Sequence, residues 1–228
     1  MNYYIIVYGL TILSVIITLA SRIFIDVSYK KYSKVKTTTR TTGQEAARYV
    51  LNKNNLEKIK ITEINGYLTD HYDPTKKQVS LSNSIHSDFS VASVAVACHE
   101  CGHAIQDKED YIFMRFRAKL VPIVNFSSYA GYISILLGSI FGAIELIWLG
   151  IILEMVILLF QLITLPVEID ASKRALSELK NTTILTGKEL KQARIMLISA
   201  ALTYVASVAT TLIQILRLVL VYTRRNRR

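Results

Sequence analysis

Long apolar runs dominate the hydropathy pattern of this 228-residue chain. The first run, residues 1–21, carries no charge and is followed by basic residues, whereas a cleaved signal peptide has its basic residues in front, so we expect a retained anchor. The second run, residues 120–167, is long enough for two spans of about 20 residues each, with a turn near residues 138–145. The third, residues 195–216, suits one more span. The pattern therefore predicts about four transmembrane helices.

The segment between the first and second runs is polar and carries signals of a small folded region. Thr42 and Glu45 have the spacing of a capping box, which predicts a helix over residues 43–54. Residues 58–64 and 78–82 alternate between apolar and polar as strands do, with turn signals between them, and this predicts a short β-hairpin. We therefore expect a mainly α membrane protein with a small α+β region.

Composition and charge agree with this class. The chain is 51% hydrophobic, has a mean hydropathy of +0.34 and carries a net charge of +10. Most of the basic residues lie within residues 22–119, so the positive-inside rule places this segment in the cytoplasm and the N-terminus outside. A last crossing would then put the tail arginines outside, and the sequence leaves open whether that helix stays partly inside. The tail arginines are Arg224, Arg225, Arg227 and Arg228.

The segment VACHECGHAIQ contains the pattern His-Glu-x-x-His inside a helix for which Ser90 is a suitable N-cap. Residues four apart on a helix are separated by about 40° around its axis, so His99 and His103 would share a face and could bind one metal ion. Glu100 would be turned by about 100°, where a carboxylate can reach a metal-bound water without binding the metal.

The only two cysteines, Cys98 and Cys101, are expected to lie off the face of the two histidines. We therefore expect them in the core of the protein. A single pair three residues apart also argues against a disulfide framework and fits a reducing compartment.

A catalytic zinc requires a third protein ligand and an open position. Glu168 is the candidate, because a hairpin of spans returns the chain to the side of His99, and Pro166 suits the first turn of a helix carrying the carboxylate. Asp170 competes with it, although its spacing to Arg174 favours an ion pair. Two further histidines remain open as ligands, His71 and His86.

Four segments in this order resemble a known family: LTDHYDPTKKQVSLS, AVACHECGHAIQ, LVPIVNFSS and QLITLPVEIDASKRAL. Over nearly the whole chain they resemble the YugP-type neutral zinc metallopeptidases of bacterial membranes, which are similar to the HtpX-type and CAAX prenyl proteases among the gluzincins. The resemblance implies that His99, His103 and Glu168 are zinc ligands and that Glu100 is the catalytic base. One position departs from the pattern, since the relatives usually read Glu-x-x-Ala-Asp and Ser172 stands where the aspartate would be.

The resemblance further implies a membrane-embedded metalloendopeptidase with one zinc per chain. Zinc lowers the pKa of its bound water toward about 7, and Glu100 would take the proton and later deliver it to the leaving amine. The substrate would be a protein or peptide in or near the lipid bilayer, and no nucleic acid partner is expected. By analogy with related folds, strand 78–82 could pair with an extended substrate. The donor to the oxyanion remains open among Asn125, Arg174 and His71.

Two other function classes remain open. Glu154 lies inside an apolar run, where ionisable residues are costly and often functional, and this would suit a transporter-like protein. Glu145 is expected to mark an exposed turn. A catalytically inactive scaffold would keep zinc but cleave nothing. Loss of Glu100 separates these classes, because only a protease should depend on it.

These expectations divide the chain into five segments in a bacterial cell membrane, crossed several times, with the active site facing the cytoplasm. They are an N-terminal anchor (1–24), a cytoplasmic peptidase region (25–119), a transmembrane hairpin (120–167), a helix carrying the third ligand (168–194), and a C-terminal hydrophobic helix with a basic tail (195–228).

Overall fold

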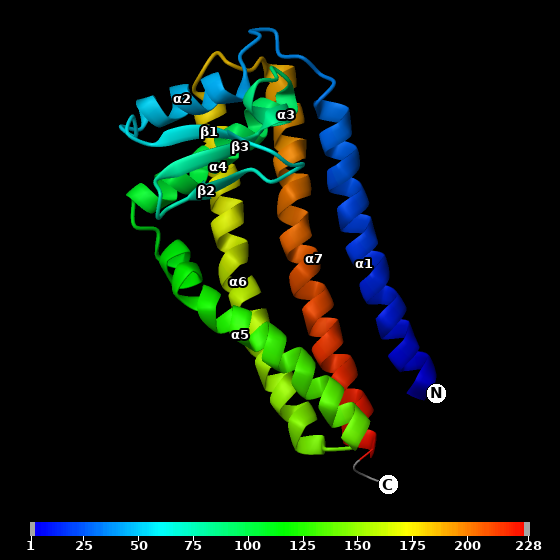
Figure 1. The fold of residues 1–228 in the computed structure, drawn as a ribbon. Coiled ribbons are helices and arrows are strands. Elements are labelled where there is room, and N and C mark those ends of the chain that lie inside the picture. Colours follow the sequence, from blue (N-terminus) through cyan, green and yellow to red (C-terminus); the bar gives the residue numbers. More distant parts are fainter. Residues whose placement is uncertain (1–2, 226–228) are drawn as a thin grey trace. The chain divides into compact units, whose positions relative to one another are not determined.

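The computed structural model describes residues 3–225 and is mainly helical, as predicted (Figure 1). Its elements are α1 (Tyr3–Tyr32), α2 (Gly43–Lys53), β1 (Lys60–Ile64), β2 (His71–Asp73), β3 (Gln78–Ser82), α3 (Asn83–His86), α4 (Val91–Lys108), α5 (Ile112–Phe141), α6 (Ile144–Lys180) and α7 (Gly187–Arg225). The chain forms two compact units, one of residues 1–22, 115–165 and 203–228, the other of residues 23–114 and 166–202. Arg227 and Arg228 of the predicted basic tail lie outside the described residues.

Four helices, α1, α5, α6 and α7, are long and apolar enough to cross a membrane, which confirms the predicted number of spans. The break between α5 and α6 falls at Gly142 and Ala143, inside the predicted interval. Gly142 has a φ of 70°, a conformation that glycine adopts without the steric cost of a Cβ atom. The protein is therefore a multi-pass membrane protein.

Within the first unit, small residues let α5 and α6 pack closely. A Cβ atom added to Gly138 would lie 2.6 Å from Cγ1 of Ile147, and one added to Gly150 would lie 3.0 Å from the carbonyl oxygen of Gly131. Such contacts matter because helices in a bilayer associate largely by close packing and interhelical hydrogen bonds. Glu154 makes a contact of the second kind, accepting a hydrogen bond of 3.0 Å from Nε2 of Gln214 on α7.

The second unit contains a three-stranded sheet in the order β1-β3-β2. Both predicted strands form and a hairpin is present, but it joins β3 to β2, a strand that the sequence did not reveal. β1 pairs with β3 in parallel, because the chain reverses direction once before β2 and again at the turn where Asp73 accepts hydrogen bonds from the backbone of Thr75 and Lys76. β3 is thus the central strand, so the expectation that it offers a free edge to substrate is wrong.

Two predicted helix starts are present with their caps. Oγ1 of Thr42 accepts a hydrogen bond from the amide of Glu45, whose carboxylate accepts one from the amide of Thr42. Ser90 caps α4 in the same reciprocal way with Ser93. These caps satisfy amide groups that have no partner inside the helix.

Pro166 does not begin a helix, contrary to the prediction. It lies inside α6, a continuous helix of 37 residues from Ile144 to Lys180. Proline lacks an amide hydrogen and removes one hydrogen bond from a helix interior, but the turns on both sides keep α6 continuous here. Glu168 is therefore carried by α6, whose first part is one of the four apolar spans.

Candidate metal centre

Helix α4 presents the two motif histidines on one side and apolar side chains to the core on the other. Members of the core cluster from this helix include Val91, Val94, Ala95, Cys98 and Cys101. The imidazole rings of His99 and His103 lie edge to face, with centroids 4.8 Å apart. The i,i+4 spacing thus brings the two rings side by side, as the sequence predicted.

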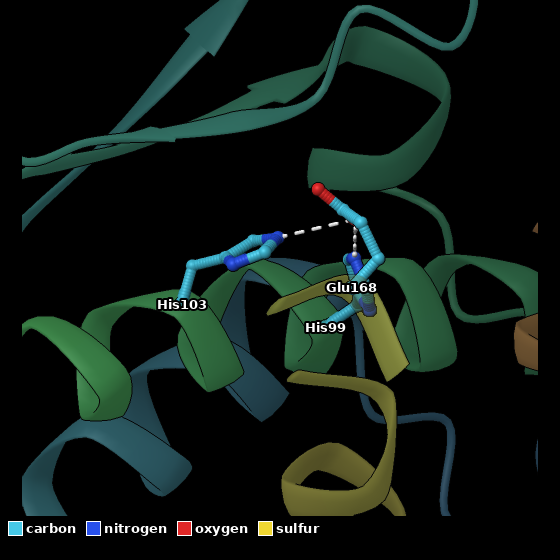
Figure 2. A group of neighbouring side chains, drawn as sticks. All are labelled: His99, His103 and Glu168. Carbon is cyan, nitrogen blue, oxygen red and sulfur yellow. Dashed lines mark hydrogen bonds and ion pairs between the residues drawn. The ribbon is translucent and has the colours of Figure 1, made fainter. Parts of the chain in front are cut away.

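Glu168 of α6 points its carboxylate at both rings (Figure 2). Its Oε2 atom lies 3.3 Å from Nε2 of His99 and 3.5 Å from Nε2 of His103. A tetrahedral zinc ion with bonds of about 2.0–2.1 Å holds its ligand atoms about 3.3 Å apart, which suits the two distances from Glu168. The ligand atoms of all three residues lie within 4.8 Å of one another. Among residues 3–225, these three side chains form the group of histidine, cysteine or acidic residues that could hold a metal ion.

The other candidate ligands lie outside this group. Asp170 forms the predicted i,i+4 ion pair with Arg174, at 2.5 Å. His71 is exposed and its Nδ1 atom lies 2.9 Å from the carbonyl oxygen of Thr69, while Nδ1 of His86 lies 3.1 Å from Oγ of Ser87. The carboxylate of Asp170 is therefore directed at a guanidinium, and the two histidines are engaged locally.

Each clustered histidine has a hydrogen-bond partner at its far nitrogen. Nδ1 of His99 lies 3.1 Å from Oγ of Ser172, the residue at which the sequence departs from the family pattern. Nδ1 of His103 lies 3.0 Å from Oε1 of Gln106. The hydroxyl of Ser172 is thus the hydrogen-bond partner of His99 at the position where the resemblance led us to expect an aspartate. Gln106 was not identified from the sequence, although its position one turn after His103 is a possible signal.

Gly102 permits the close approach of α4 and α6 that brings these groups together. A Cβ atom at this position would lie 2.4 Å from the carbonyl oxygen of Ala171 and 3.0 Å from its Cα atom. Sequence reasoning passed over this residue, although a glycine inside a helical pattern is a recognised sign of tight packing.

Glu100 is nearly buried, with 7% of its surface exposed. Its carboxylate makes no hydrogen bond or ion pair with any other residue of the described chain. A carboxylate without such a partner remains available to accept a proton from water, which suits a general base.

The electrostatics of α4 separate its histidine side from its cysteine side. Burial lowers the pKa of His103, but the hydrogen bond to Glu168 and the charge of that carboxylate outweigh burial, so the pKa is raised overall. The carboxylate of Glu168 thus favours positive charge beside the two histidines. Burial raises the pKa of Cys98 to about 12 and also raises that of Cys101. Both cysteines are fully buried free thiols, which confirms that they belong to the core.

The edge strand β2 is fastened to α4 one turn beyond His103. The hydroxyl of Tyr72 donates to Oδ2 of Asp107 at 2.7 Å, and Nζ of Lys77 binds the same oxygen. β2 pairs with β3 on one side only and forms an edge of the sheet, which lies over α4 in Figure 1. β2 is therefore an edge strand that is held to α4 through Asp107.

Two of the predicted oxyanion donors, Arg174 and His71, belong to the second unit and have other partners. Arg174 is engaged by Asp170 and by Glu109, the latter at 2.6 Å. His71 lies at the exposed start of β2, and Asn125 is an exposed residue of α5 in the first unit.

Comparison with known proteins gives a consistent picture. Residues 5–223 match the family described as "Putative neutral zinc metallopeptidase". The chain is 40% identical over 195 residues to "Putative membrane protease YugP" of Bacillus subtilis (strain 168), covering 86% of this chain and 87% of that protein. No solved structure matches the chain.

Proposed function

Because this chain belongs to the neutral zinc metallopeptidase family, we propose that it is a membrane-embedded zinc endopeptidase with a single zinc ion per chain. In this proposal His99, His103 and Glu168 bind the ion and Glu100 is the catalytic base. The observation that carries it is the convergence of Glu168 on both motif histidines at distances that suit a tetrahedral metal.

Bound zinc would supply Lewis acidity toward the scissile carbonyl and toward water. Glu100 would accept a proton from the attacking water and return it to the nitrogen of the leaving amine. The near burial of Glu100 supports this role, because a carboxylate shielded from bulk solvent exchanges protons mainly with groups in the site.

The substrate would be an extended peptide segment of a membrane or membrane-proximal protein. β2 ends the strand order β1-β3-β2, and an edge strand is the position at which a peptide could add as a further strand. The contact of Tyr72 with Asp107 would hold this edge close to the turn that follows His103. β2 replaces β3 in the substrate-binding role inferred from the sequence.

Metal analysis of the purified full-length protein tests the proposed site. We expect about one zinc per wild-type chain and a loss of most of the metal in the His99→Ala, His103→Ala double variant, because a single carboxylate remains. The matched control is the His71→Ala, His86→Ala double variant, which should keep its zinc. Full zinc occupancy after loss of His99 and His103 would contradict the proposed ligands.

We further propose that the zinc site faces the cytoplasm. Single cysteines at Lys53 and Lys188, both exposed in the second unit, would report on this in a chain whose two native cysteines are replaced by alanine. A membrane-impermeant thiol reagent should label neither position in intact cells and both after permeabilisation. Labelling of either one in intact cells would contradict this orientation.

A further inference from the structure

We infer that Gln106 is a positioning residue that fixes His103 in the tautomer with its proton on Nδ1, so that Nε2 faces Glu168. Gln106 is fully buried and lies one turn beyond His103 on α4. The inference rests on the proposed zinc site and adds a residue that is neither one of the proposed ligands nor the proposed base.

The side-chain amide of Gln106 makes three hydrogen bonds. Oε1 lies 3.0 Å from Nδ1 of His103, and Nε2 donates to the carbonyl oxygen of Val167 at 2.8 Å and to Oδ2 of Asp170 at 2.9 Å. The two acceptors belong to α6, which also carries Glu168. One glutamine therefore connects a histidine of α4 to the backbone and side chain that flank Glu168.

The chemistry of these partners allows only one direction for the chain of hydrogen bonds. A backbone carbonyl and a carboxylate are both acceptors, so the NH₂ group of Gln106 must face Val167 and Asp170. Oε1 then faces His103, and because an amide oxygen only accepts, Nδ1 of His103 must carry a proton. In the neutral ring the lone pair is consequently on Nε2, the atom that lies 3.5 Å from Oε2 of Glu168.

The acceptor Asp170 is itself held in place. Nε of Arg174 binds the same Oδ2 atom at 2.5 Å, and Nη1 of Arg174 binds Oε2 of Glu109 at 2.6 Å. Reversing the amide of Gln106 would turn its oxygen toward the carboxylate and the carbonyl, with the loss of both hydrogen bonds to α6. The charged pair thus fixes the orientation of the glutamine, which in turn fixes the ring.

His99 has no comparable constraint. Its Nδ1 partner is the hydroxyl of Ser172, which can either donate or accept a hydrogen bond. The two histidines are therefore supported unequally, and the fixed tautomer belongs to His103.

Zinc affinity of the detergent-solubilised full chain, measured by competition with a chromophoric chelator, tests the inference. Gln106→Leu keeps the volume and removes the acceptor, and we expect zinc binding about 10-fold to 100-fold weaker, the usual cost of losing a partner of a metal-bound histidine. Gln192→Leu is the control, because Oε1 of Gln192 is buried without a hydrogen-bond partner among the described residues.

Nitrogen-15 NMR of the zinc-loaded wild-type protein gives a second readout that needs no variant, since the chain has only four histidines. We expect a slowly exchanging proton on Nδ1 of His103 and none on its Nε2. A proton on Nε2 would overturn the inference, as would unchanged zinc affinity in Gln106→Leu. A wild-type chain that binds no zinc would instead overturn the proposed function, and the inference with it.

Discussion

Replacement of Glu100 by glutamine is expected to lower peptide hydrolysis by about 100-fold or more while zinc content stays at the wild-type level. The amide is close in size to the carboxylate but cannot take a proton from water, and general acid–base assistance typically contributes 10²–10⁴-fold. Zinc should remain because Glu100 lies outside the group formed by His99, His103 and Glu168. Turnover of a quenched fluorescent peptide and metal analysis on the same preparations measure both quantities.

The control for this change is Glu63→Gln, which makes the same chemical substitution at an exposed position on β1 and should leave both quantities unchanged. Undiminished hydrolysis in Glu100→Gln would contradict the proposed base. Wild-type protein that binds zinc and hydrolyses no peptide would favour an inactive scaffold. A transport activity that tolerates Glu100→Gln would favour a transporter-like protein.

Gly102→Ala is expected to weaken zinc binding by about 10-fold or more, although no ligand is changed. The added Cβ atom would lie 2.4 Å from the carbonyl oxygen of Ala171. The helix backbones fix the positions of both atoms, so no change of side-chain rotamer can relieve the contact. α4 and α6 must then separate, which moves Glu168 away from the two histidines. Overpacking of this kind costs about 1–3 kcal/mol of folding free energy, so the thermal midpoint should also fall.

Gly187→Ala provides the comparison for Gly102→Ala, since a Cβ atom at Gly187 meets nothing within 4 Å. It should leave zinc affinity and the thermal midpoint unchanged or slightly improved, as alanine is the better helix former. Wild-type zinc affinity in Gly102→Ala would show that the two helices need not approach so closely to form the site.

The part of the site that is local in sequence could be predicted, and the part that depends on tertiary contact could be predicted only in outline. His99 and His103 lie on one face because of helix geometry alone, so their spacing was sufficient. Glu168 was proposed by counting membrane crossings and by resemblance, and the structure brings it to 3.3 Å from His99. Gly102 and Gln106 acquire their roles through contacts with α6, so a local pattern can mark the two positions but not the residues that they touch.

The errors have a similar origin. β2 has three residues between turn signals, too few for an alternating pattern to be visible. The chain reverses direction twice between β1 and β3, so these two strands are parallel. The predicted hairpin assumed a single reversal, which would have made them antiparallel. Pro166 was read as a helix start by its intrinsic preference, whereas the continuity of α6 overrides that preference.

The order of the proposed ligands along the chain has a consequence for biogenesis. His99 and His103 are synthesised before the apolar helix α5 and the apolar part of α6, and Glu168 only after them. A nascent chain that ends before residue 168 has only two of the three proposed ligands. Once Glu168 is made, bringing it to the histidines without the membrane hairpin carries the entropic cost of closing a long loop. Zinc loading would therefore follow membrane insertion. A chain that has not been inserted would lack peptidase activity and could not cleave soluble proteins.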